Sequence, residues 1–311
     1  MTKRVKQKPI KPPLLTDIWR ERWLYIIMVP GIVFFAVYRY LPMFGLAMAF
    51  QDYRPAFGIA GSKWVGFKHF LRLFSEPSFF MLLRNTLIIA FLNLVIFFPF
   101  TIILALFLNE VRINIIKRFV QSITYLPHFL SWVVIASLTY KLLSQEHGMV
   151  AGIMKALGKD TISFLASREW FRSIIVTQGI WRDLGWGSII FLAAIAGIEQ
   201  DMYEAAIVEG ATRLQRMWYV TLPAIRPTII IILILRLGRF MDLGFEQIFV
   251  QINAMNRSVG EIFDTYIYEM GVTGGQYSYT TAVGMFKAVI GAVLVIGANT
   301  LAKRIGEEGV Y

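Results

Sequence analysis

The 311-residue chain is strongly apolar: 57% of its residues are hydrophobic, only 16% are charged, and the mean hydropathy is +0.59. Soluble domains carry about 25% charged residues, so these values exclude a water-soluble globular protein and indicate an integral membrane protein. The lack of cysteine excludes disulfides and iron–sulfur clusters, and with three widely separated histidines we expect no metal site. The net charge of +11 comes from basic residues that flank apolar runs, which indicates membrane topology rather than nucleic-acid binding.

Residues 1–23 precede the first apolar run. Residues 1–13 hold five Lys/Arg and three prolines, and no small-residue cleavage site of a signal peptide follows them. Residues 14–23 (LLTDIWRERW) have the pattern of a short amphipathic helix at a membrane interface, with Trp19 and Trp23 as anchors. We therefore expect a basic cytoplasmic tail and an interfacial helix over residues 1–23.

Six apolar runs of about 20 residues or more follow, each long enough to cross a bilayer as a helix. With a cytoplasmic N-terminus, the cytoplasmic segments hold fifteen Lys/Arg and the external segments eight, a bias that favours this orientation. The predicted fold is an all-α polytopic membrane domain over residues 24–302, with a cytoplasmic tail over 303–311. The predicted spans are residues 24–44, 80–108, 119–143, 171–198, 227–250 and 280–302.

The fourth span contains polar and aromatic residues at membrane depth, where ionisable groups usually face a bundle interior or a water-filled path. Arg182 is a candidate for such a path, while Trp181 and Trp186 could stack on a ligand or anchor the helix at an interface. Because Arg182 and Asp183 are adjacent, we expect their side chains to point in different directions. In the third span we expect His128 to be packed or hydrogen-bonded rather than to act as a ligand.

The most informative segment is the loop over residues 199–226, which the predicted topology places in the cytoplasm. Glu204 stands in the first turn of a predicted helix, where the helix dipole favours an acid. Gly210 permits a close approach or a sharp turn, and Pro223 ends the amphipathic segment that follows. This helix–glycine–helix pattern is too ordered for a linker, and we expect a partner protein to grip it.

The fifth span carries a charged stripe. Arg236, Arg239, Asp242 and Glu246 are three, three and four residues apart, so on one continuous helix they share a face. One interpretation places this face and the neighbouring Gln247 on a translocation path, where the arginines hydrogen-bond hydroxyl groups or a carboxylate of a ligand. The alternative is a salt-bridge ladder that only fixes helix packing.

The sixth span contains Lys287 near its middle, with no acid on its own helix. A buried ammonium needs a partner, which could be Asp242 or Glu246 of the fifth span, or an acidic substrate. A structural ion pair between helices and a place on the path both remain open.

The loop resembles the EAA loop of binding-protein-dependent ABC importer permeases, in which EAA is followed by an acid, Gly-Ala and, about ten residues later, Leu-Pro. The acid is Glu209 here, where Asp is usual. Other segments, among them FQDY (50–53), YLPHFLSW (125–132) and GFEQIF (244–249), are similar to the carbohydrate-uptake subgroup, and more narrowly to permeases for complex or uronic-acid oligosaccharides such as rhamnogalacturonan and alginate. The matching loop residues are Glu204, Ala205, Ala206, Gly210, Ala211, Leu222, Pro223 and Pro227.

This resemblance implies a type I ABC importer permease fold in a bacterial cell (inner) membrane, with a coupling helix that docks on an ATPase. The implied cargo is an oligosaccharide, and the cations inside the spans favour an acidic one. The implied partners are a second homologous permease, two copies of a cytoplasmic ATPase and an external solute-binding protein, all assembled at the lipid bilayer.

An ATP-binding loop of the form G-x-x-x-x-G-K-[ST] is absent. The nearest stretch, residues 152–160, has five residues between its glycines and Asp160 in place of Ser/Thr. We therefore expect no enzymatic activity and no cofactor in this chain, with ATP and Mg²⁺ bound by the partner ATPase. The alternatives are an ion-coupled secondary sugar transporter, which does not need the 199–226 loop, and a non-transporting membrane scaffold.

Overall fold

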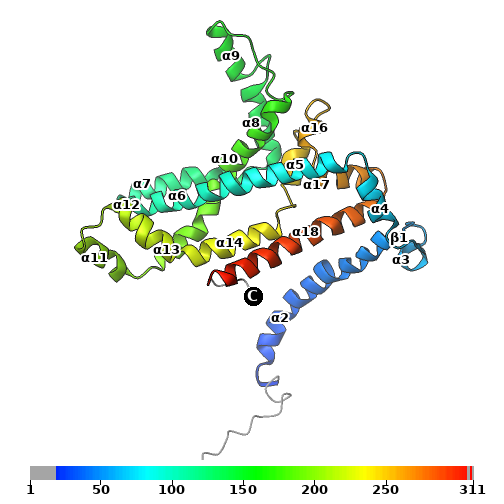
Figure 1. The fold of residues 1–311 in the computed structure, drawn as a ribbon, viewed down its shortest axis with the longest axis horizontal. Helices are drawn as coiled ribbons and strands as arrows, with labels where there is room; N and C mark the ends of the chain where they lie inside the picture. The colour runs from blue at the N-terminus through cyan, green and yellow to red at the C-terminus, as the bar shows by residue number, and fades with distance from the viewer. Residues whose placement is uncertain (1–18, 307–308, 310–311) are drawn as a thin grey trace, which may run out of the picture.

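The computed structural model describes residues 19–306 and 309, so parts of the predicted interfacial helix and of both predicted tails lie outside the described residues. The described part is mostly helical (Figure 1). Four continuous helical runs are long and apolar enough to cross a membrane. They are Arg22–Phe50 (α2, Arg22–Phe35; η1, Ala36–Tyr40; η2, Leu41–Phe50), Phe79–Glu110 (α5, Phe79–Leu92; η3, Asn93–Phe97; α6, Phe98–Glu110), Arg168–Ala196 (α10) and Tyr277–Arg304 (α18).

Two further runs are apolar enough to cross a membrane but are sharply bent, and counting each as one span gives the six that the sequence predicts. In the third span, α7 (Asn114–Tyr125) and η4 (Leu126–Phe129) meet α8 (Trp132–Leu143) at 103°. In the fifth, the run formed by α12 (Arg213–Arg216), η5 (Met217–Thr221) and α13 (Leu222–Ala224) meets α14 (Arg226–Gly238) at 59°.

The predicted fifth span is wrong in its second half. It was expected to run to residue 250, but α14 ends at Gly238 and residues 239–244 are not helical before α15 (Phe245–Phe249) begins. Glycine at 238 and 244 lowers helix propensity at both ends of this segment. Local turns satisfy part of the backbone instead, since the Asp242 amide donates to the Arg239 carbonyl at 2.9 Å.

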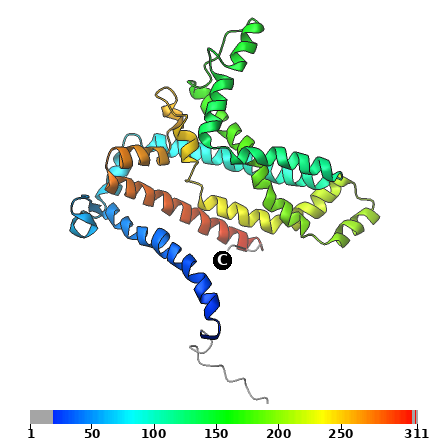
Figure 2. The same ribbon diagram turned by 180° about the vertical axis from the view of Figure 1, so that it is seen from behind.

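The break in the third span has a local cause as well. Pro127 stands in the last turn before the break, and Ser131 opens the next helix as its N-cap. The Ser131 hydroxyl accepts a hydrogen bond from the Val134 amide at 3.3 Å, which satisfies one of the free amides of α8. As a result α8 leaves the helix bundle, and Figures 1 and 2 show it projecting away with α9 (Met149–Ala156) at its far end.

Shorter elements lie at the two ends of the bundle. Figures 1 and 2 place α11 (Gln200–Val208), from the loop before the fifth span, at one end of the bundle. The loop before the second span, which contains the short strand β1 (Gln51–Asp52), lies at the opposite end. This agrees with the alternation of loops that the sequence predicts. The remaining elements are β1 (Gln51–Asp52) paired antiparallel with β2 (Lys63–Trp64), α3 (Gly58–Gly61), α4 (Lys68–Ser75), α16 (Arg257–Gly260), α17 (Phe263–Ile267) and η6 (Tyr268–Thr273).

The bundle is held by close helix crossings at small residues. A Cβ on Gly185 of α10 would lie 2.2 Å from the Thr124 carbonyl oxygen of α7, and a Cβ on Gly291 of α18 would lie 2.8 Å from the Gly238 carbonyl oxygen of α14. Such contacts allow membrane helices to approach closely without a hydrophobic driving force between them. By contrast, α2 buries none of its residues, so its apolar surface is left for lipid or a partner.

Candidate functional site

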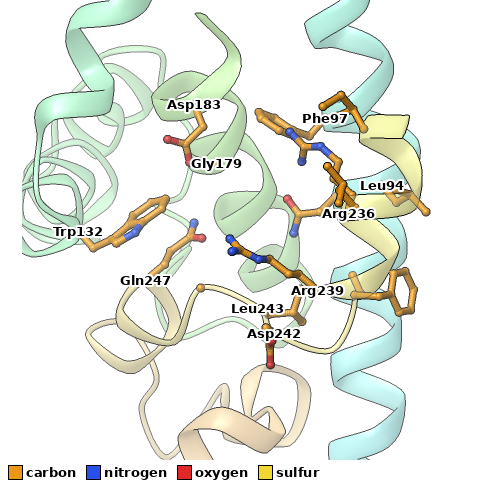
Figure 3. Close-up of a pocket in the computed structure, with 16 residues that line it drawn as sticks. Leu94, Phe97, Trp132, Gly179, Asp183, Arg236, Arg239, Asp242, Leu243 and Gln247 are labelled. Atoms are coloured by element: carbon orange, nitrogen blue, oxygen red, sulfur yellow. The ribbon is translucent and has the colours of Figure 1, made fainter. Parts of the chain in front are cut away.

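A cavity of about 710 Å³ opens beside the break between α14 and α15. Its walls come from α5 and η3, from the start of α8, from the middle of α10, and from the last turns of α14 with the segment after it (Figure 3). The lining residues are Ala90, Asn93, Leu94, Phe97, Trp132, Gly179, Asp183, Ile232, Leu235, Arg236, Arg239, Phe240, Asp242, Leu243, Gly244 and Gln247.

Two arginines give the cavity its positive charge. The Arg236 guanidinium lies over the rings of Phe97 and Phe98, 4.8 and 5.5 Å from their centroids. Figure 3 shows Arg239 reaching into the cavity toward Gln247. Within the described part of the chain, neither arginine forms an ion pair with an acidic side chain. Both guanidinium groups therefore keep hydrogen-bond donors for a ligand.

The two acids of the cavity, in contrast, are each bound by a cation that does not line it. Asp183 accepts from the Arg182 guanidinium at 3.1 Å and lies 2.7 Å from Nδ1 of His128. Asp242 lies 2.9 Å from Nζ of Lys287, which is only 6% exposed. Each acid of the cavity is thus in contact with a cation, whereas neither arginine of the cavity forms an ion pair among the described residues.

The stripe predicted for the fifth span is therefore wrong, because its members do not share one helix. Arg236 is in the last turn of α14, Arg239 and Asp242 lie in the non-helical segment, and Glu246 is an exposed residue of α15 that does not line the cavity. The alternative of a salt-bridge ladder along one helix fails for the same reason. The partner expected for Lys287 is confirmed for Asp242, and a second carboxylate, Asp264 of α17, binds the same ammonium.

The expectation for Arg182 and Asp183 is also wrong, since the two side chains do pair. The Arg182 Nε donates to the Leu130 carbonyl at 3.2 Å, and Nη1 of the same guanidinium donates to Asp183 at 3.1 Å. His128 is hydrogen-bonded, as predicted, and its ring stacks on Trp186 at 4.4 Å. Trp186 therefore packs beside this polar cluster rather than on the cavity, and Trp181 lines a separate apolar pocket between α8 and α10.

Gln247 is held rigidly at the cavity. Its amide donates to the Ile175 carbonyl at 2.7 Å and to the Gln178 side chain at 3.3 Å, so α15 is tied to α10. Sequence reasoning missed Trp132 and Asp183 as cavity residues. The sequence signals were that Asp183 is adjacent to Arg182 and that Trp132 ends the segment YLPHFLSW. The 103° bend that brings Trp132 to the wall is not visible in hydropathy.

The segment over residues 199–226 has the helix–glycine–helix form that the sequence predicts. After α11 the chain makes a Schellman turn: the Ala211 amide donates to Ala206 at 2.9 Å, and the Gly210 amide to Ile207 at 3.0 Å. Gly210 has a φ of +80° with no other atom near its Cβ position, so the turn itself requires glycine. No residue of α11 is buried, and Glu204, Ala205 and Glu209 are exposed, as an element that docks on a partner requires.

The same segment is connected to the bundle at its other end. Thr212 opens α12 with a capping box to Gln215. Leu222 packs on the cluster formed by α6, α10 and α14, while the hydroxyl of Tyr203 in α11 lies 3.0 Å from that of the buried Thr221. A force on α11 therefore has a short path to the helix that carries Arg236.

Comparison with known proteins agrees with this arrangement. Residues 97–307, more than half of the chain, match the model of the family described as binding-protein-dependent transport system inner membrane component. The polygalacturonan/rhamnogalacturonan transport system permease protein YteP of Bacillus subtilis (strain 168) is 50% identical over 305 residues, covering 98% of this chain and 95% of that protein. Protein LplB of the same strain is 51% identical over 292 residues, covering 94% and 92%.

A solved structure shows the same fold. It is a bacterial alginate ABC transporter in complex with an alginate pentasaccharide-bound periplasmic protein, and one of its chains is 40% identical with a TM-score of 0.87. The match covers 96% of this chain and 99% of that one. The chain therefore belongs to the family of binding-protein-dependent transport system inner membrane components: it is an ABC importer permease, a transport component rather than an enzyme.

Proposed function

We propose that this permease imports acidic, uronic-acid-containing oligosaccharides, and that the cavity beside α14 is part of their path. The observation that carries the proposal is the charge of this cavity. Arg236 and Arg239 line it and form no direct ion pair among the described residues, whereas its two acids contact Arg182 and Lys287. A planar guanidinium binds a carboxylate through two parallel hydrogen bonds, so this pair of arginines suits an anionic sugar.

The size and lining of the cavity support the same cargo. A volume of about 710 Å³ falls within the range of roughly 300–1,000 Å³ that is usual for ligand pockets. Asn93 and Gln247 also line the cavity, and their side-chain oxygens can accept hydrogen bonds from hydroxyl groups.

The relatives point in the same direction. One is named for polygalacturonan and rhamnogalacturonan, and one matched structure is described as importing the acidic polysaccharide alginate. At 50% and 40% identity over nearly the whole chain, a common class of cargo is a reasonable inference.

A permease of this kind works with another permease, an ATPase and a solute-binding protein. We infer that two cytoplasmic ATPases, which bind ATP and Mg²⁺, grip α11 and the equivalent helix of a second, homologous permease. On this proposal the termini are cytoplasmic, and the binding protein delivers the sugar to the outer loops. Movement of α11 then passes through Tyr203, Thr221 and Leu222 to α14, which turns the cavity outward.

The test is uptake by proteoliposomes that contain the complete complex and its binding protein. Uronic-acid oligosaccharides and neutral oligosaccharides of the same length are compared, with ATP enclosed. We expect saturable, ATP-dependent uptake with a clear preference for the acidic series. Equal uptake of both series would overturn the acidic cargo, and uptake driven by a proton gradient without ATP would favour the secondary-transporter alternative.

A further inference from the structure

Lys287 occupies an unusual position behind the cavity wall. It is 6% exposed, does not line the cavity, and contacts two carboxylates from different elements. Asp264 of α17 is a mostly buried partner, with a side chain that is 21% exposed. Asp242, in contrast, is 67% exposed and belongs to the non-helical segment that forms the cavity wall. One buried ammonium therefore connects a fixed acid to an acid on the edge of the cavity.

The position of Asp242 relative to Arg239 gives this contact a consequence. The two residues stand three apart in one turn, in which the Asp242 amide donates to the Arg239 carbonyl at 2.9 Å. Opposite charges at this spacing are within reach of each other through small side-chain rotations. Figure 3 nevertheless shows the Asp242 carboxylate turned away from the cavity while the Arg239 guanidinium points into it. The contact with Lys287 at 2.9 Å accounts for this separation.

We propose that Lys287 is a specificity-determining positioning residue: it holds Asp242 away from Arg239, and thereby keeps that guanidinium free to bind a carboxylate of the cargo. The inference rests on the proposed function, since it concerns how the same cavity selects acidic sugars. Lys287 does not touch the cargo itself. Its second partner, Asp264, keeps the ammonium in place, so the orientation of Lys287 does not depend on the exposed Asp242 alone.

The critical variant removes the partner of Asp242 without leaving the Asp264 carboxylate buried and unpaired. Lys287→Met with Asp264→Asn removes both the ammonium and its buried partner, so Asp242 is left to pair with Arg239. The matched control adds Asp242→Asn to these two changes and removes the competing carboxylate. Both variants are compared with the wild type in the complete complex, by measuring KM and kcat for uronic-acid and neutral oligosaccharides of equal length.

For Lys287→Met/Asp264→Asn we expect the KM for the acidic sugar to rise at least about tenfold, the size of one lost charge-assisted interaction, with the neutral sugar unaffected. In the triple variant we expect most of this loss to be reversed. In an Arg239→Gln background, the double change should raise the acidic KM no further, because the residue through which Asp242 acts is already gone. Lys287→Arg, which keeps both ion pairs, should retain the acidic preference.

The inference is overturned if the double variant keeps the wild-type KM for the acidic sugar, or if the double and triple variants lose both sugars equally, which would make Lys287 a packing residue only. Co-purification with the partner subunits checks assembly. Lys287→Gln/Asp264→Asn replaces the first variant if that one does not assemble, with the same expectation. A wild type that does not distinguish the two sugars would instead overturn the proposed function.

Discussion

The two ends of α14 are built in different ways. Before its first residue, the coupling segment is shaped by neighbours in sequence: the Schellman turn at Gly210 and the capping box at Thr212 each close within a few residues. After its last residue, the non-helical segment over residues 239–244 depends on partners distant in sequence, because Lys287 of α18 binds Asp242. A segment whose turns close within a few residues is determined locally, whereas a cavity forms only where several helices meet.

Gly185 lies at a helix crossing in the bundle, and Gly210 lies in a locally formed turn. We expect substitution of Gly185 to have the largest effect. A Cβ on Gly185 would lie 2.2 Å from the backbone oxygen of Thr124, so Gly185→Ala has to separate α10 from α7. We expect a loss of assembled complex, because neither backbone can yield locally. Thermal unfolding and the yield of purified complex measure this effect. Gly284→Ala in α18, where no atom lies within 4 Å, is the matched control and should leave stability unchanged or slightly raised.

The second prediction concerns the coupling end. Gly210 has a φ of +80° and no close neighbours, so Gly210→Val should distort the turn and abolish ATP-coupled uptake while the protein still inserts into the membrane. Asparagine tolerates this backbone region, and Gly210→Asn should retain a larger share of uptake. ATPase activity and uptake of the reconstituted complex are measured side by side. If asparagine is as harmful as valine, glycine is required at this position because the ATPase approaches closely, and not because of the backbone conformation of the turn.

At the cavity end we expect a smaller and more selective effect. Arg239→Gln should raise the KM for acidic oligosaccharides at least about tenfold, because it removes a charge-assisted contact of about 1.5–3 kcal/mol. The ATPase activity without cargo and the transport of neutral sugars should change little. Concentration-dependent uptake measures the effect, and Glu246→Gln, at an exposed position of α15 outside the cavity, is the control variant. An equal loss for both sugars would place Arg239 in the architecture of the segment rather than in cargo binding.

We expect the smallest effect at the contact between α11 and the run that precedes α14. Tyr203→Phe removes the hydrogen bond between α11 and Thr221 and leaves the ring in place. A neutral hydrogen bond contributes about 0.5–1.5 kcal/mol, so we expect a loss of a few-fold in the amount of sugar imported per ATP hydrolysed. Parallel measurement of uptake and phosphate release checks this ratio. An unchanged ratio would mean that the Leu222 contacts alone transmit the movement.

Local patterns were the reliable part of the sequence. The left-handed turn at Gly210 follows from that glycine, because such a turn is decided by residues close in the chain. The two predicted helix ends are wrong in detail. The helix α11 begins at Gln200 with Asp201 in its first turn, four residues before Glu204, and the next helical run continues through Pro223 to Ala224. The charged stripe of the fifth span failed for the opposite reason. The spacing of Arg236, Arg239 and Asp242 is helical, yet a glycine at each side and a distant lysine favour a broken backbone there.

Composition and hydropathy by themselves determined that the chain lies in a membrane and that six segments are apolar enough to cross it, because transfer into lipid depends on the sum of side chains in each segment. Only the tertiary structure decided which charges face the cavity. A carboxylate such as Asp183 or Asp242 pairs with a neighbouring cation or leaves that cation free, depending on which other group it contacts. For Asp242 this group is Lys287 of α18, and for Asp183 it includes His128, which lies beside the bend of the third span.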